Sequence, residues 1–132
     1  MLYDAHNHLQ FEELTPHLDL IATDLAAINL GGAVVNGTHP DDDWDDVVAL
    51  AARFDWVIPS FGIHPWDVSA RPDDWQLKFI HYLETHPRAH VGEIGLDRWI
   101  LELGRDKDPM LNGAAPAPIE EQMEICAWQL RW

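Results

Sequence analysis

Cysteine, basic residues and long apolar runs are all scarce in this sequence. Its 132 residues include one cysteine, Cys126, so no disulfide can form within the chain, as is typical of proteins from a reducing compartment. No uninterrupted apolar run reaches the roughly 20 residues that a bilayer crossing needs, and no basic segment followed by an apolar one opens the chain. These absences argue against a disulfide-stapled secreted scaffold and predict a cytoplasmic protein with no membrane partner.

Basic residues are outnumbered by acidic ones. The sequence has 8 Lys and Arg against 23 Asp and Glu, which gives a formal net charge of −15. Affinity that depends on neutralising phosphates needs a basic surface, so this balance disfavours binding of nucleic acid by charge alone. An enzyme that acts on phosphate esters with bound divalent ions stays open, because the ions themselves supply local positive charge.

Short apolar stretches alternate with helical periods along the chain. Strands are expected at 2–7, 33–37, 56–63 and 89–94, and helices at 16–28, 40–54, 72–86 and 119–132. For the first helix we expect Thr15 as the N-cap before Pro16, and Gly31 and Gly32 as the end. The repeated strand–helix order predicts an α/β fold with a parallel sheet flanked by helices.

The length of the sequence limits how many strand–helix units it can form. Each strand–helix unit takes about 30 residues and a complete eight-unit barrel about 250, so this sequence of 132 residues holds four units. A doubly wound open sheet also fits that length. The residues at the expected strand ends favour the barrel. We therefore expect residues 1–132 to form a single incomplete domain, the N-terminal (βα)4 half of a TIM-type (β/α)8 barrel, which stops inside its fourth helix.

Two histidines follow the first apolar residues, in MLYDAHNHLQ. Side chains at i and i+2 of a strand share a face, so His6 and His8 are expected to point the same way. Neutral imidazoles are common ligands of Zn and related divalent ions. A bare His-x-His pair also occurs by chance, and two unrelated surface or core histidines are the alternative.

Glu93 strengthens the metal interpretation. It ends an expected strand between Gly92 and Gly95, and in parallel β/α folds the functional groups gather at the C-terminal ends of strands. A buried glutamate needs a partner, so Glu93 either binds metal or accepts a salt bridge or hydrogen bond. His64 ends the preceding strand in FGIHPWD, where it contacts substrate, orients a ligand, or is a structural histidine beside Pro65. The Asp41–Asp43 run is interpreted as a solvated helix start.

Five stretches together resemble the TatD-like metal-dependent hydrolases. They are, in the family's order, DAHNHL (4–9), NGT (36–38), FGIHPW (61–66), VGEIGLDRW (91–99), and EEQ with QL (within 120–130). The resemblance implies a (β/α)8 barrel with one or two divalent ions, Zn, Mg or Mn, at its strand ends. It also implies hydrolysis of phosphodiesters of the DNase or exonuclease type, with nucleic acid or another phosphoester as substrate.

The resemblance also implies roles for six residues. His6 and His8 match the first metal's ligands, and Glu93 matches a shared metal ligand that takes part in catalysis. A second group is expected to bind substrate or to orient ligands, namely His64, Asp97 and Asp4.

The family's remaining ligands have no counterpart in this sequence. Further histidines come from the fifth and sixth strands and a catalytic aspartate from the eighth, so we expect weak metal binding and little or no turnover from these residues alone. The missing C-terminal half is then supplied elsewhere. The alternatives are a non-enzymatic half-barrel that self-associates as a homodimer through open strand edges, or a related hydrolase of a non-nucleic ester or amide. The stretch 103–118 is expected to be a long loop.

Overall fold

The structure is a computed structural model that describes residues 1–102 and 115–132. Its elements are, in chain order, β1 (Leu2–Asn7), the 3-10 helix η1 (Glu12–His17), α1 (Leu18–Ala27), β2 (Leu30–Gly37), α2 (Trp44–Arg53), β3 (Val57–Phe61), α3 (Trp75–Thr85), β4 (His90–Val91), α4 (Trp99–Glu102) and α5 (Ile119–Gln129). Of the expected loop over 103–118, only 115–118 lie within the described residues, and they are irregular.

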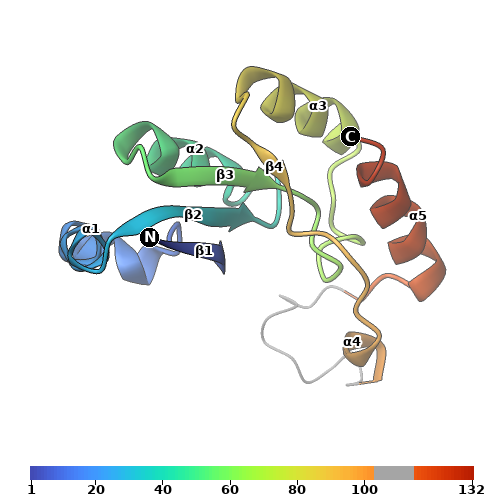
Figure 1. Cartoon of the computed structure of the whole chain (residues 1–132). Helices are drawn as coiled ribbons and strands as arrows, with labels where there is room; N and C mark the ends of the chain where they lie inside the picture. The colour runs from blue at the N-terminus through green and yellow to red at the C-terminus, as the bar shows by residue number, and fades with distance from the viewer. Residues whose placement is uncertain (103–114) are drawn as a thin grey trace.

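The four strands form one parallel sheet in the order β1-β2-β3-β4. Ala33 pairs with Val57 between β2 and β3, and Phe61 with Val91 between β3 and β4. Figure 1 shows the strands running in one direction, so that their C-terminal ends meet at one edge. The predicted α/β half-barrel is confirmed, since strands that follow one another in sequence order without a switch are the pattern of a barrel rather than of a doubly wound sheet.

The hydrophobic core lies between the sheet and helices α2 and α3. Trp44, fully buried at the start of α2, packs its ring 5.4 Å from the ring of Phe61 and 5.1 Å from that of Tyr82. Val47 and Leu50 follow Trp44 at helical spacing and are buried on the same face. This packing fixes β3 against its helices and therefore fixes the end of β3 from which the site is built. None of the described helices, over residues 1–102 and 115–132, has the length and hydropathy that a membrane crossing requires.

The expected ends of the first helix were wrong. Thr15 and Pro16 lie inside η1, and α1 begins only at Leu18. Gly31 lies within β2, where a Cβ atom would meet the side chains of Met1 and Tyr3, the nearest atom being Met1 Cγ at 2.5 Å. The left-handed residue after α1 is instead Asn29, at φ 59°.

The fourth strand is shorter than the expected 89–94 and ends at Val91. Beyond it, the Gly92 N–H donates to Phe61 O at 3.0 Å, and the Glu93 N–H donates to Gly37 O at 3.3 Å. The chain thus leaves the edge of β3 and crosses the end of β2. Gly62 permits this crossing, because a Cβ there would overlap the Glu93 carbonyl.

Candidate functional site

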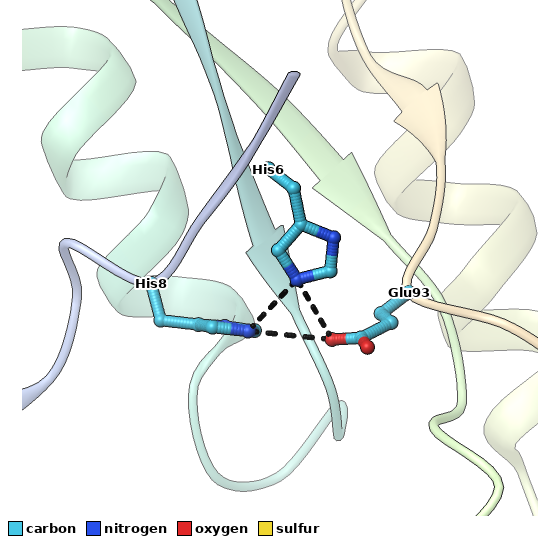
Figure 2. A group of neighbouring side chains, drawn as sticks. All are labelled: His6, His8 and Glu93. Atoms are coloured by element: carbon cyan, nitrogen blue, oxygen red, sulfur yellow. Dashed lines mark hydrogen bonds and ion pairs between the residues drawn. The ribbon is translucent and has the colours of Figure 1, made fainter. Parts of the chain in front are cut away.

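Three side chains from the two outermost strands of the sheet, or from the residues that follow them, converge at its C-terminal edge. His6 comes from β1, His8 follows β1, and Glu93 follows β4, and Figure 2 shows them pointing toward one another. The His6 and His8 Nε2 atoms are 3.2 Å apart, and they lie 3.5 and 3.3 Å from Glu93 Oε2. The side chain of His6 is 53% exposed and those of His8 and Glu93 are 25% exposed, so the cluster is open to solvent.

The main chain of β2 selects the tautomer of His8. His8 Nδ1 lies 2.9 Å from Asn36 O, and because a carbonyl only accepts, Nδ1 carries the proton. In the neutral imidazole, Nε2 then keeps its lone pair and directs it at the cluster. Gln10 Nε2 donates to the same carbonyl at 2.6 Å. Sequence reasoning predicted neither the Asn36 carbonyl nor Gln10 as a partner here, although the NGT stretch that contains Asn36 was part of the resemblance.

Asp43 was misinterpreted as part of a solvated helix start. Its carboxylate is half-buried and accepts the Thr38 N–H at 2.9 Å, the His39 N–H at 3.1 Å and the Gln10 Nε2–H at 2.9 Å. It therefore holds the turn after β2 together and anchors Gln10 beside the His8 tether.

Asp4 contacts the backbone of the first metal-ligand candidate. Its Oδ1 accepts the His6 N–H at 3.0 Å and its Oδ2 accepts the Asn7 Nδ2–H at 3.0 Å. The pairing of β1 with β2 is irregular between Asp4 and Asn7. The Asp4 carboxylate bridges this irregularity, so it supports the presentation of His6 rather than entering the cluster.

His64 faces the cluster through its other nitrogen. Its Nδ1 accepts the Trp66 N–H at 3.2 Å, so in the neutral ring Nε2 carries the proton and donates to Glu93 Oε1 at 3.4 Å. Asp97 lies apart from the cluster: its Oδ2 accepts the Trp66 Nε1–H at 2.6 Å and its Oδ1 accepts the Ile100 N–H at 3.3 Å. His64 is therefore a hydrogen-bond donor to the site, and Asp97 is a support for Trp66 beside it.

The contacts in the cluster shift the pKa values of Glu93 and His8 in opposite directions. Hydrogen bonds from His64 and His8 hold the pKa of Glu93 well below its ordinary 4.5, against the opposing effect of burial. The hydrogen bond with Glu93 raises the pKa of His8 above 6.5, again against burial. The Glu93 contribution to stability is complete above pH 4.5 and that of His8 below pH 6.5. In the metal-free chain the pair therefore stabilises most between these values, and the contribution is lost as the pH rises through the folded pKa of His8 or falls through that of Glu93.

Replacing Glu93 by glutamine should lower the pKa of His8, because the largest cause of its elevation is removed while burial still opposes the imidazolium. The measurement is an NMR titration of the imidazole signals in metal-free protein with a chelator present. Glu84→Gln, at an exposed position of α3, is the matched control. An unchanged His8 pKa in Glu93→Gln would show that this pair does not form in solution.

The three clustered atoms fit a divalent cation. Ligand atoms about 2.1 Å from a tetrahedral Zn ion stand about 3.4 Å from one another, and the observed separations are 3.2 to 3.5 Å. Two nitrogens and a carboxylate oxygen are a donor set that Zn and related ions accept. The open side of the cluster leaves room for further ligands, so His6, His8 and Glu93 could hold one face of a metal centre.

Comparison with known proteins places the chain in a family. The family model described as TatD related DNase matches residues 3–132. The chain belongs to the TatD-related DNase family. The resemblance drawn from the sequence is thereby confirmed at the level of the family.

Two relatives of this TatD-family chain show how much of a longer protein it corresponds to. The Cut9-interacting protein scn1 of Schizosaccharomyces pombe is 33% identical over 124 residues, which cover 93% of this chain and 33% of that protein. The crystal structure of YJJV, a TatD homologue from Escherichia coli K12, superposes with a TM-score of 0.76 at 24% identity and covers 98% of this chain and 45% of that one. The chain therefore spans less than half the length of either relative, and the structural likeness shows the fold alone.

Proposed function

We propose that this chain supplies the first part of a divalent metal centre in a hydrolase that cleaves phosphodiester bonds. The observation that carries the proposal is the convergence of His6, His8 and Glu93, whose ligand atoms all lie within 4.8 Å of one another. These residues come from the two outer strands of the sheet or directly follow them, and they meet at an edge that is open to solvent. Membership of a family described as DNases supports a phosphodiester as the bond.

Each residue of the site has a chemical task in this proposal. His6, His8 and Glu93 hold the metal, which when bound supplies a water of lowered pKa and polarises a phosphoryl oxygen. Glu93 also takes part in catalysis in this proposal, because as a ligand it would hold the metal in the position from which the metal acts. The His64 Nε2–H, now directed at Glu93 Oε1, donates to a phosphoryl oxygen of the substrate. The positions of His6 and Trp66 are kept by the carboxylates of Asp4 and Asp97 respectively.

Ligands beyond these three come from outside the chain in this proposal, either from a C-terminal half-barrel or from a second copy. Strand β1 pairs with β2 alone within the described residues, and on it Leu2 is 56% and Tyr3 68% exposed, which leaves an edge and apolar side chains for a further strand to cover. A protein without such a partner would bind metal weakly and turn over little. The net charge of −15 favours, as a second candidate, a phosphate-free ester or amide substrate.

The proposal is tested by calorimetric titration with Zn²⁺, with Glu93→Gln as the variant. We expect one weak site in the unaltered chain and an affinity at least about tenfold lower in Glu93→Gln, because an anionic ligand is lost while its shape is kept. The protein should stay folded, with a melting temperature lowered only by the loss of the pair between Glu93 and His8. A large fall in melting temperature with unchanged Zn²⁺ affinity would instead make Glu93 a structural acceptor.

Two model substrates, bis(4-nitrophenyl) phosphate and 4-nitrophenyl acetate, show which class of bond is cleaved. Hydrolysis of each is measured with and without Zn²⁺. Metal-dependent turnover of the phosphodiester, however slow, supports the nuclease-type proposal. Turnover of the acetate alone would favour the second candidate.

A further inference from the structure

Helix α5 carries two glutamines that the metal centre does not use. Gln122 and Gln129 are both fully buried, at 0% exposure, although glutamine is seldom inside a protein. They are seven residues apart, about two helical turns, and so lie on the same face of α5. Buried amides persist where they are hydrogen-bonded, so the partners of these two side chains indicate what they do.

Gln129 pairs with a single residue of the loop after β3. Its Oε1 accepts the Ile63 N–H at 2.7 Å, and its Nε2 donates to Ile63 O at 3.5 Å. A neighbouring strand would satisfy the same two groups, but β3 has ended at Phe61. The side chain thus replaces a strand partner at the residue directly before His64.

Gln122 does the same for the loop after β4. Its Oε1 accepts the Asp97 N–H at 2.8 Å, and its Nε2 donates to Asp97 O at 3.3 Å and to Ala117 O at 2.9 Å. Asp97 in turn accepts the Trp66 Nε1–H at 2.6 Å, and the Trp66 main chain donates to His64 Nδ1. The two glutamines therefore hold His64 from both sides, through Ile63 and through Asp97 with Trp66.

We propose that Gln122 and Gln129, here called the α5 clamp, are positioning residues that set the His64 Nε2–H opposite Glu93. Neither glutamine contacts the cluster, and both act on the backbone of the two loops that end in it. An apolar side chain of similar size would fill the same space but leave the N–H and C=O groups of Ile63 and Asp97 unpaired in the core. The consequence for catalysis rests on the proposed function, whereas the clamp itself is a property of the metal-free chain.

The test compares Gln129→Met and Gln122→Met with two controls. Ile125→Val weakens packing on the buried face of the same helix without removing a hydrogen bond, and Gln76→Met makes the same exchange at an exposed position of α3. In Gln129→Met the Ile63 amide should exchange with solvent at least about tenfold faster, as loss of a hydrogen bond to a buried amide implies. In Gln122→Met the Trp66 indole N–H signal should shift, although Gln122 does not touch Trp66. Zn²⁺ affinity should fall by about tenfold in both, the effect of losing a group that orients a site.

A merely structural role predicts another result. If the glutamines only stabilise the fold, Ile125→Val should accelerate exchange at the Ile63 amide and shift the Trp66 signal as much as the glutamine variants do. The comparison is made between variants with an equal loss of melting temperature. That result would overturn the clamp. If the Met variants do not fold, the unaltered chain still decides the matter, because a scalar coupling from Ile63 N to the Gln129 side-chain carbonyl exists only if that hydrogen bond forms. Absence of Zn²⁺ binding in the unaltered chain would end the proposed function and leave the exchange and coupling results to judge the clamp.

Discussion

Replacing both His6 and His8 by alanine should lower the affinity for Zn²⁺ by at least about 100-fold, to below detection in a site that starts weak. Even groups that only orient a metal ligand are worth about 10- to 100-fold in affinity, and this double variant removes two of the three ligands themselves. Glu93 alone would remain, and a single carboxylate does not select Zn²⁺ from solution. Calorimetric titration and metal content after dialysis measure the effect.

Surface imidazoles bind Zn²⁺ weakly in many proteins, so the control removes two others. His17 in η1 and His81 in α3 are both exposed, and neither belongs to the cluster of ligand candidates. His17→Ala with His81→Ala should leave the affinity and the stoichiometry as they are. Unchanged stoichiometry in the His6 and His8 double variant, or an equal loss in the control, would remove these two histidines from the ligand set.

The order of elements was predictable because each strand and helix has its own local pattern. The apolar run at 33–37 lies within β2 and that at 56–63 contains the shorter β3, and the period of Trp44, Val47 and Leu50 marks one helical face. Parallel pairing then follows from the helices between the strands. The exact ends were less predictable: Gly31 and Gly32 belong to β2 rather than to the end of α1, and Asn29 turns the chain instead.

The site was predictable where single residues carry the chemistry. His-x-His at the end of one strand and Glu93 after another meet in space, because parallel strands end at one edge and the chain after β4 crosses the end of β2. The groups that orient them were less predictable, although Gln122 and Gln129 lie in the EEQ and QL stretches that carry part of the family resemblance. The Asn36 carbonyl that fixes the His8 tautomer is a backbone atom, and any residue could have supplied it. The α5 clamp joins Gln129 to Ile63 across 66 positions, and the QL stretch itself does not indicate a partner so distant in the sequence.

Trp44→Ala should have the largest effect on stability. Trp44 is fully buried among the rings of Phe61, Phe79 and Tyr82, at centroid distances of 5.4, 6.3 and 5.1 Å. Truncation of a buried aromatic to alanine costs about 3–5 kcal/mol, a large share of the roughly 5–15 kcal/mol that stabilises a typical domain. Urea unfolding followed by far-UV circular dichroism should therefore show a midpoint far below that of the unaltered chain, or a chain already partly unfolded.

Two further variants separate packing from polarity at this position. Within the described residues the Trp44 Nε1–H has no hydrogen-bond partner, so Trp44→Phe loses volume but also removes an unpaired buried donor. It should cost clearly less than Trp44→Ala. Trp99→Ala, at a tryptophan that is 53% exposed, should change the free energy of unfolding by less than about 1 kcal/mol. If Trp44→Ala were as mild as Trp99→Ala, the aromatic core between β3 and its helices would not be what holds the end of β3, and with it His64, in place.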